Sequence, residues 1–401
     1  MRPRSARAGF RPDLGVDACA PVTPSARFLI IGNPANRRVG LFLEALAEQG
    51  LEADVVAWAD LLRSFSVLQA IEGPRLVRID SYGEDFAVER ELLRRGGFPG
   101  AQTIPERHGE LLAPALSYRG FQGVLRELDA FFATRPEWQL LHFPKEIDEL
   151  FDKRRTSRRF LAAGVPVPEF LEDVPESPSA LLAAVRARGW RQIFVKPTMG
   201  SSASGVLLVS LTDSGATIRT SLEWEAPRWF NNLRLSHYRT KADVDRALGF
   251  VLSLGAQVER AIPKARLGGA YFDCRVLCIA GEPRFVVVRQ NKHPITNLHL
   301  GGWRGEVSAL QAAMPEGAWA SAMDSCRKVA SLYRSLQLGL DVMFEPGLAR
   351  HRVIEANAFG DLLPNLMLEG LSVYGWEIRE ALRSVGMRSS SPAPNTLRSS
   401  R

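Results

Sequence analysis

Two apolar, strand-like runs near the C-terminus of this sequence, "GLDVMF" and "VIEANAFG", carry acidic and amide side chains among their apolar residues. If the runs form a hairpin in which Glu345 lies opposite His351 across the loop "PGLAR", then Asp341 lies directly opposite Glu355. Their Cβ atoms are then roughly 4.5 to 5.5 Å apart. This register limits the possible folds more than any other feature of the chain, because it places two carboxylates side by side within a sheet.

A bound cation would resolve this conflict of charges. Like charges directly opposite each other destabilise a sheet, and the predicted hairpin offers no Lys or Arg at a paired position. Asn357 lies on the same face, two residues beyond Glu355. Two carboxylates and an amide suit Mg²⁺, whose remaining positions go to phosphates and water. We therefore predict a metal site at Asp341, Glu355 and Asn357, with a pair of solvated surface strands as the alternative. The residues predicted to face the core are Val342, Phe344, Ile354 and Ala356.

The segment "FVKPTMGSSASGV" has the composition of a phosphate-binding loop. Lys196 ends an apolar strand predicted at 191–197, where an ammonium group requires an anionic partner. Glycines in the following loop permit unusual backbone angles, so that its N–H groups can converge on phosphate oxygens. The loop is not a Walker A motif, and a plain turn is the alternative. Its candidate ligand-binding residues are Thr198, Gly200, Ser201, Ser202, Ser204 and Gly205.

The first ordered segment reads as one βαβ unit. An apolar strand at 28–31 precedes an amphipathic helix at 37–49 and a second strand at 53–58. Such a unit implies a parallel sheet with helices on its faces. No GxGxxG motif is present, so a dinucleotide fingerprint is missing. The two ends of the chain, 1–26 and 386–401, are rich in Pro, Ser and Arg and are predicted to be disordered.

The rest of the chain predicts a mixture of strands and helices. Residues 216–239 are predicted to form a hairpin inserted on the rim of a lobe, and 315–336 one long helix. Other predicted helices are 86–95, 120–133, 177–189 and 241–253. Other predicted strands are 206–210, 256–262, 271–280, 284–290, 338–345 and 351–357.

Composition and charge exclude several classes of protein. Of the 401 residues 46% are hydrophobic and 24% charged, which is typical of a globular protein, and no apolar run reaches the ~20 residues of a membrane span. Residues 1–27 and 385–401 carry +3 each of the net charge of +7, so we expect no nucleic-acid partner and no membrane partner. Four cysteines without CxxC spacing argue against a zinc site, and Cys274 and Cys278 are predicted to share a buried strand face. We expect a cytoplasmic location.

Seven motifs in a fixed order resemble the ATP-grasp superfamily. They are "DKRRTSRRFLAAGVPVP", "FVKPTMGSSASGV", "VERAIP", "FDCRVLCIAGEP", "VRQNKHPITNLHLGG", "GLDVMF" and "VIEANAFG". Within the superfamily they are most similar to ATP-dependent carboxylate-amine ligases such as the glutamate ligases that modify a ribosomal protein. The resemblance implies an α/β protein with an N-terminal Rossmann-like domain at 27–145. A two-lobed ATP-grasp domain would follow at 146–385, α+β in character, with a small lid lobe at about 165–262 that contains the 216–239 insert.

The resemblance also implies roles for individual residues. Lys153 and Lys196 match the two phosphate-contacting lysines, and the loop from Thr198 to Gly205 matches the lid over the phosphates. Glu259 and Ala261 match the hinge whose backbone reads the adenine edge, and Arg275 matches the arginine that neutralises the transferred phosphoryl group. Asp341, Glu355 and Asn357 match the metal ligands. Arg289 and Asn297, with Gly301 and Gly302, match the loop at the acyl-phosphate site. His293 and His299 lie near it in the sequence and are predicted to be structural or positioning groups, with a general base as the alternative.

The reaction implied by the resemblance uses ATP and Mg²⁺, or Mn²⁺ as a substitute ion. A substrate carboxylate is activated as an acyl phosphate and an amine then displaces phosphate; the substrates are small molecules or peptides. A kinase of the same fold, acting on a hydroxyl group, and a nucleotide-binding module without catalysis are the alternatives. The insert, with Trp224 and Trp229, either caps the acceptor site or packs on the body. The oligomeric state stays open, with a homodimer as one option.

Overall fold

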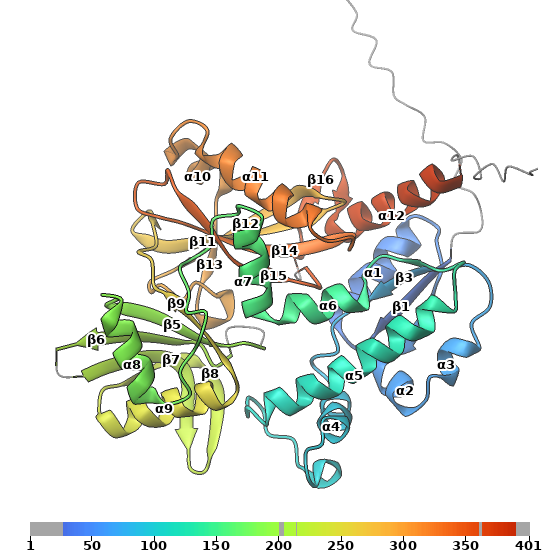
Figure 1. Ribbon diagram of the computed structural model, residues 1–401. Coiled ribbons are helices and arrows are strands. Elements are labelled where there is room, and N and C mark those ends of the chain that lie inside the picture. Colours follow the sequence, from blue (N-terminus) through green and yellow to red (C-terminus); the bar gives the residue numbers. More distant parts are fainter. Residues whose placement is uncertain (1–26, 200–203, 214, 361–362, 390–401) are drawn as a thin grey trace, which may run out of the picture.

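The computed structural model of this chain describes residues 27–199, 204–213, 215–360 and 363–389 (Figure 1). It is an α/β structure with one parallel sheet and two larger antiparallel sheets, which agrees with the predicted fold class. The predicted tails lie outside the described residues, except that the last helix continues to Ser389. The boundaries predicted for the domains stay predictions.

The N-terminal unit (residues 27–145) is built on a parallel sheet of order β2-β1-β3-β4. The predicted βαβ unit is confirmed as β1 (Phe28–Gly32), α1 (Arg37–Glu48) and β2 (Ala53–Ala57). The strand was predicted to include Trp58, but this residue begins the next helix. The remaining strands and helices of the unit are α2 (Trp58–Arg63), α3 (Ser66–Gln69), β3 (Leu76–Ile79), α4 (Phe86–Arg95), η1 (Ala101–Thr103), α5 (Pro114–Ala133) and β4 (Gln139–Leu140).

Two glycines allow α4 and α5 to cross closely. A Cβ atom on Gly96 would lie 1.8 Å from the Leu116 carbonyl oxygen, and one on Gly120 would lie 1.9 Å from that of Leu92. Any larger residue at either position would therefore push the helices apart. Helix α5 begins at Pro114, earlier than the predicted start at 120, because Pro is well suited to the first turn of a helix.

The large lobe is an antiparallel sheet of order β13-β12-β11-β14-β15, with β10 paired to β11. Cys274 and Cys278 are buried on one face of β11 and are free thiols, as predicted. The helix predicted at 315–336 is present but shorter, at Ala318–Ser331, and a further helix at Val307–Ala313 precedes it. Pro315 and the left-handed Gly317 (φ 74°) separate the two helices. The lobe comprises α6 (Pro144–Phe151), α7 (Lys153–Ala162), β10 (Arg266–Leu267), β11 (Ala270–Ile279), β12 (Glu282–Asn291), η2 (Leu298–Leu300), β13 (Trp303–Gly305), α10 (Val307–Ala313), α11 (Ala318–Ser331), β14 (Gln337–Phe344) and β15 (His351–Asn357).

The predicted hairpin exists, with one correction to its register. Asp341 does lie opposite Glu355, but His351 pairs with Phe344 and not with Glu345. The two facts agree because a β-bulge between them leaves Ile354 as an extra residue on β15. The bulge also turns Ile354 to the side opposite the core, where it lines the pocket described below, whereas Val342, Phe344 and Ala356 are buried as predicted.

The small lobe is a five-stranded antiparallel sheet of order β8-β7-β6-β5-β9, with two helices on one face. The hairpin predicted at 216–239 is present as β7 and β8, and it forms the edge of this sheet. Trp229 is buried against Phe250 of α9 at 5.2 Å between ring centroids, and Trp224 packs on Trp229 at 5.0 Å. Both rings therefore pack on the body of the lobe, which is one of the two predicted outcomes. The lobe comprises α8 (Pro178–Ala187), β5 (Gln192–Pro197), β6 (Leu207–Thr212), β7 (Gly215–Glu225), β8 (Arg228–Tyr238), α9 (Lys241–Ser253) and β9 (Ala256–Arg260).

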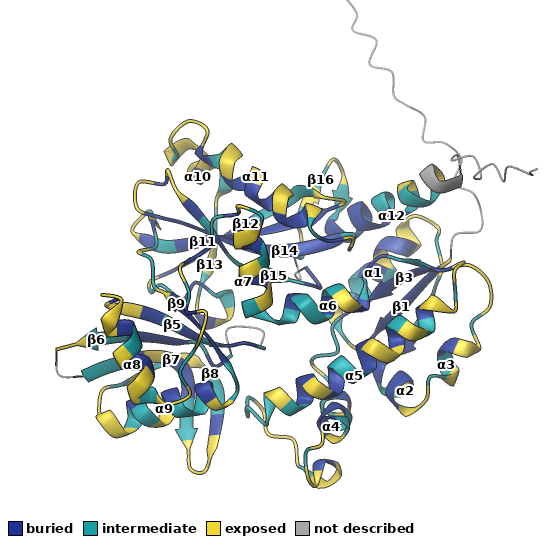
Figure 2. Ribbon diagram, in the orientation of Figure 1, coloured by how far each residue is buried: buried dark blue, intermediate teal, exposed yellow. Residues whose placement is uncertain are grey.

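The end of the described chain returns to the N-terminal unit, which the sequence analysis did not anticipate. After β16 (Met367–Leu368) and β17 (Leu371–Ser372), helix α12 (Val373–Ser389) packs beside α1. Tyr374 and Ile378 share a hydrophobic cluster with Phe28 and Phe42, and the buried faces are dark in Figure 2. No helix of the described residues is long and apolar enough to cross a membrane.

Candidate active site

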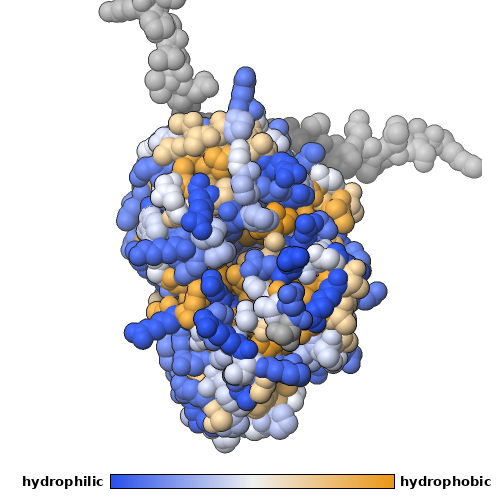
Figure 3. Space-filling model, turned by 90° about the vertical axis from the view of Figure 1, so that its left-hand side faces the viewer, coloured by the Kyte–Doolittle hydropathy of each residue, from blue (hydrophilic) through white to orange (hydrophobic). Residues whose placement is uncertain are grey.

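A pocket lies where the small lobe faces the large lobe, and it brings together side chains from both. Figure 3 shows this side of the molecule, where apolar side chains lie along the boundary between the two lobes and charged ones cover the surfaces around it. The pocket is lined by Lys153, Pro168, Phe194, Lys196, Pro197, Ser204, Val206, Glu259, Arg260, Ile262, Lys264, Asp273, Arg275, Arg289, Pro294, Ile295, Thr296, Asn297, Asp341, Met343, Ile354, Glu355 and Asn357. Most of the predicted site residues are therefore neighbours.

The three predicted metal ligands all face this pocket. Asp341 on β14 and Glu355 on β15 are cross-strand partners, and Asn357 follows two residues later on the same strand. The Asn357 amide nitrogen donates a hydrogen bond to the Gly339 carbonyl at 3.3 Å, which leaves the amide oxygen as the atom suited to a cation.

Asp341 does have a cation at a paired position, contrary to the prediction, and it comes from a strand outside the hairpin. Arg275 lies directly opposite Asp341 on β11, the other neighbour of β14, and its Nε donates to Asp341 Oδ1 at 2.5 Å. Arg289 approaches the second oxygen of Asp341 at 3.0 Å. Burial alone would raise the pKa of Asp341, but the two guanidinium groups hold it below its ordinary value.

The other acids of the pocket are paired with lysines. Lys153, at the start of α7, lies 3.2 Å from Glu355, and Lys196, near the end of β5, lies 2.6 Å from Glu259. Burial alone would lower the pKa of Lys196, but the fields of Glu259 and Glu355 raise it, so the ammonium group stays charged. Lys196 thus has the anionic partner that the sequence analysis required.

The predicted adenine hinge has a more complex geometry than expected. The side chain of Glu259 is buried and holds Lys196, and Gln257 supports it with a hydrogen bond of 2.7 Å. The N–H of Ala261 donates to the Gln192 carbonyl at 2.9 Å, and Arg260 and Ile262 on either side of it line the pocket. The hinge role of Glu259 and Ala261 stays a prediction, and Ile262 is an additional candidate.

A second group of charges was not identified from the sequence. Asp273 is buried and accepts hydrogen bonds from Arg289 Nε at 2.7 Å, Lys264 Nζ at 3.1 Å and the Thr296 hydroxyl. Burial alone would raise the pKa of Asp273, yet Arg289 and Lys264 lower it; burial lowers the pKa of Lys264 more than Asp273 raises it. One sequence signal existed: Asp273 lies two residues from Arg275 in a strand, and therefore on the same face.

The loop between β12 and β13 contributes Asn297 to the pocket. The Asn297 side chain also accepts a hydrogen bond from the His299 N–H at 3.0 Å, which fixes the turn that follows. Gly302 must be a glycine, because a Cβ atom there would lie 2.9 Å from the Gln290 carbonyl oxygen. His293 and His299 do not line the pocket.

The predicted phosphate loop is only partly described. Gly200, Ser201 and Ser202 lie outside the described residues. Ser204 lines the pocket. Gly205 has a φ of 75°, and a Cβ atom there would lie 2.7 Å from the Pro197 side chain, so a larger residue would clash. Thr198 is buried, and its carbonyl accepts a hydrogen bond from the Lys153 N–H at 3.1 Å, which ties the loop to α7.

The donor set fits a magnesium ion. Among the described residues no group of three or more acidic, His or Cys side chains could hold a metal ion, so this candidate set includes the amide oxygen of Asn357. Two carboxylates and one amide on adjacent strands are an incomplete oxygen set, which suits an ion that keeps water and phosphate oxygens as further ligands. Asp341, Glu355 and Asn357 are therefore the residues that would hold it.

Comparisons with known proteins bear on the fold. No protein-family model and no curated protein matches the chain. Among solved structures, the D-cycloserine synthetase DcsG has a TM-score of 0.52 and 15% identity over 90% of this chain and 99% of its own. The macrocyclase MdnC of Microcystis aeruginosa MRC, bound with precursor peptide MdnA, has 0.52 and 12% over 89% and 99%. An ATP-grasp ligase of Chryseobacterium gregarium, in complex with ADP and a leader and core peptide, has 0.50 and 11% over 92% and 98%. The chain therefore has the ATP-grasp fold, which is the fold that the resemblance of its sequence motifs implied.

Proposed function

We propose that this protein is an ATP-dependent ligase that activates a carboxylate as an acyl phosphate and transfers the acyl group to an amine. One observation carries the proposal: a single pocket brings together the three candidate oxygen ligands with the four cations predicted from the sequence, Lys153, Lys196, Arg275 and Arg289. A protein that only binds nucleotide has no need of a complete set of groups that neutralise a transferring phosphoryl group.

The proposed reaction requires no covalent bond to the protein. A carboxylate oxygen of the substrate forms a bond to the γ-phosphorus of ATP as the bond from that phosphorus to the β,γ-bridging oxygen breaks, and ADP leaves. The amine nitrogen then attacks the acyl carbon, inorganic phosphate leaves, and the amine releases a proton to solvent. Positioning and charge neutralisation are sufficient for both steps.

The pocket residues that were predicted from the sequence have distinct roles in this scheme. Lys153 and Lys196 would bind the phosphates, and Arg275 and Arg289 would stabilise charge on the transferring group, with Asn297 beside the acyl phosphate. Magnesium, held by Asp341, Glu355 and Asn357, would neutralise phosphate charge and orient the chain of phosphates. In this structure each of the two lysines and two arginines faces a carboxylate of the protein. Substrate binding would therefore exchange these internal ion pairs for pairs with phosphate and metal.

The proposed acceptor is an amine, which is either a small molecule or a peptide. The structural neighbours include a synthetase of the small molecule D-cycloserine and ligases bound to peptides. We propose a small-molecule or peptide carboxylate as the first substrate and an amine as the second.

An ADP-release screen tests this function. Purified protein is incubated with ATP, magnesium and pools of carboxylates and amines, and the masses of the products are measured by mass spectrometry. We expect ADP release that needs both pools and a product lighter by one water than its two precursors. The variant Glu355→Gln, which removes one metal-binding charge at constant size, should lose at least about tenfold in rate. A stable phosphate ester of a hydroxyl group, formed without any amine, would instead establish a kinase.

A further inference from the structure

The turn that follows β15, the strand with Glu355 and Asn357, accepts hydrogen bonds from both the large lobe and the N-terminal unit. It runs from Asn357 to Gly360, and the Gly360 N–H donates to the Asn357 carbonyl at 3.4 Å. Gly360 has a φ of 63°, and its carbonyl accepts a hydrogen bond from Arg275 at 3.1 Å. The turn also lies against Gly339 of β14, where a Cβ atom would come within 2.7 Å of the Gly360 oxygen. The turn is therefore packed tightly against the strand that carries Asp341.

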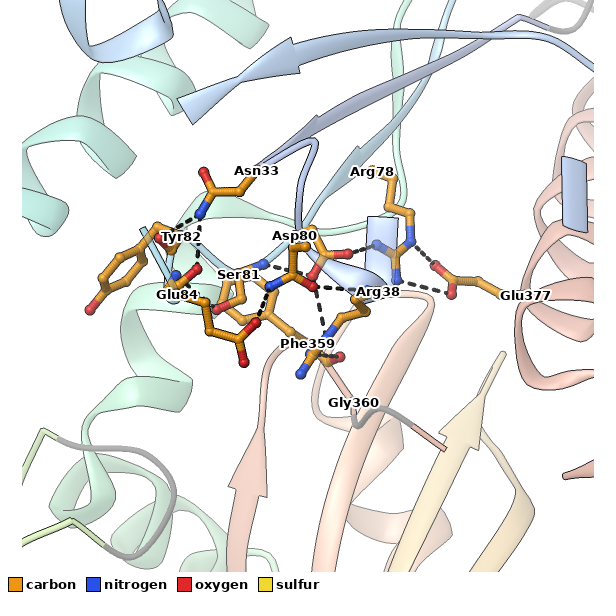
Figure 4. Close-up of polar contacts among 12 residues, drawn as sticks. Asn33, Arg38, Arg78, Asp80, Ser81, Tyr82, Glu84, Phe359, Gly360 and Glu377 are labelled. Atoms are coloured by element: carbon orange, nitrogen blue, oxygen red, sulfur yellow. Dashed lines mark hydrogen bonds and ion pairs between the residues drawn. The ribbon is translucent and has the colours of Figure 1, made fainter. Parts of the chain in front are cut away.

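The second contact with this turn comes from the N-terminal unit. Arg38, in the first turn of α1, donates a hydrogen bond from Nη1 to the Phe359 carbonyl at 2.9 Å. Figure 4 shows this side chain between the end of the parallel sheet and the Phe359–Gly360 turn. The side chain is 21% exposed. Arg38 is thus the contact by which a side chain of the N-terminal unit reaches the turn next to the metal ligands.

A chain of buried polar groups keeps Arg38 in this position. Asp80, at the end of β3, lies 3.8 Å from Arg38 and is itself paired with Arg78. Arg78 in turn donates to Glu377 of α12 at 2.9 Å. Burial alone would raise the pKa of Asp80, but Arg78 and Arg38 lower it, so its charge is kept in the folded state. The guanidinium of Arg38 is therefore aimed by a carboxylate that cannot move freely.

A basic residue at this position is unexpected from helix physics alone. The N-terminus of a helix carries partial positive charge, so Arg37 and Arg38 in the first turn of α1 oppose the dipole, and no acidic residue compensates them there. Arg37 is exposed, whereas Arg38 is half-buried and has the two partners described above. Since the charge of Arg38 is unfavourable for the stability of α1, its position indicates a role outside this helix.

We propose that Arg38 is a positioning residue of the magnesium site: from the N-terminal unit it holds the turn at Phe359 so that Asn357 and Glu355 keep the geometry a metal requires. The inference rests on the proposed function, since it concerns the same metal. Groups behind metal ligands orient them, and magnesium tolerates little departure from its preferred geometry. In this proposal the N-terminal unit contributes a residue to the support of the nucleotide site.

The test measures the affinity for magnesium in full-length variants. Binding of ATP is followed by calorimetry over a magnesium series, so that the apparent magnesium affinity is separated from the affinity for the nucleotide. For Arg38→Ala we expect the apparent magnesium affinity to fall roughly ten- to a hundredfold, the range found when groups behind metal ligands are removed. The matched control is Arg37→Ala, one residue away on the same helix and exposed, which should bind magnesium as the wild type does.

A conservative variant separates positioning from folding. Arg38→Lys can still donate to the Phe359 carbonyl and face Asp80, so we expect it to recover most of the magnesium affinity. The inference is overturned if Arg38→Ala binds magnesium like the wild type, or if it loses nucleotide affinity equally at every magnesium concentration, which would indicate a general structural role. Should the wild-type protein itself fail to bind ATP with magnesium, the proposed function is refuted and not this inference alone.

Discussion

At the scale of the single residue, His142 is a buried titratable group that stays neutral in the folded protein. His142 follows β4 and is fully buried, and neither of its ring nitrogens has a partner within the described residues. Burial, and then the nearby charge of Arg78, lowers the pKa of His142 to about 3. The folded protein therefore keeps this imidazole neutral at pH values where an unfolded chain would protonate it.

This difference predicts a pH-dependent stability. Between about pH 6.5 and about 3 the unfolded state binds a proton at His142 and the folded state does not, so stability falls as the pH falls. The variant His142→Leu removes this proton uptake. Between pH 7.5 and pH 5.5 we expect the wild type to lose about 1.4 kcal/mol more unfolding free energy than the variant. Urea titrations at the two pH values measure the difference, and equal losses in the two proteins would contradict the assignment.

Most residues of the candidate site could be predicted from the sequence, because the period of a strand decides which face each side chain lies on. Asp341, Glu355 and Asn357 were placed on one face from the hairpin alone, and Arg275 was turned away from the buried cysteines by the same rule. Lys264 and Asp273 were not found. Their contact joins the segment before β10 to β11, and no local pattern specifies which loop folds over which strand.

At the scale of the element, the β7–β8 hairpin lies at the edge of a lobe as predicted and makes a further contact that no local sequence pattern indicates. It extends the small-lobe sheet at its edge, and its outer strand pairs with a loop of the N-terminal unit: the Asn231 N–H donates to the Gly109 carbonyl at 2.7 Å. Gly109 has a φ of 80°, and a Cβ atom there would lie 2.8 Å from the Asn231 oxygen. The hairpin thus joins two units of the molecule.

Trp229 should be essential to the small lobe. It is 6% exposed and stacks on Phe250, so Trp229→Ala should cost about 3 to 5 kcal/mol of unfolding free energy through the cavity it leaves. The control is Leu233→Ala on the same strand, where the side chain is 71% exposed and the expected cost is within about 0.5 kcal/mol. Denaturant titration compares the two. A stable Trp229→Ala variant with altered acceptor choice would support the alternative, a cap over the acceptor site.

At the scale of the whole molecule, the C-terminal helix closes the structure on its beginning. Helix α12 buries Glu377 beside Arg78 and Asp80 of β3, and the Arg78 guanidinium also lies 4.5 Å from the centroid of the Phe42 ring. The large lobe therefore has the N-terminal unit attached at both its ends, once through the chain that leads into α6 and once through α12.

Removal of the shared cation tests this attachment. Arg78→Met leaves Asp80 and Glu377 buried without their partner, which should cost about 3 to 5 kcal/mol. Arg383→Met, which removes a half-exposed pair with Glu380 on the same helix, should cost less than about 1 kcal/mol. Urea unfolding measures both variants. If the two lose the same small amount, α12 is held by its apolar contacts alone.

The sequence by itself determined the local structure of this protein and the face on which each catalytic candidate lies. Helix caps, glycine breaks and periods of two or 3.6 residues act over a few positions, so the βαβ unit, the acid pair and most strands could be located within a residue or two. Tertiary structure alone decided the bulge at Ile354, the ion pairs of Asp341 with Arg275 and Arg289, and the return of α12 to β3. These features depend on contacts between residues far apart in the chain, and their energy exists only once the lobes have packed together.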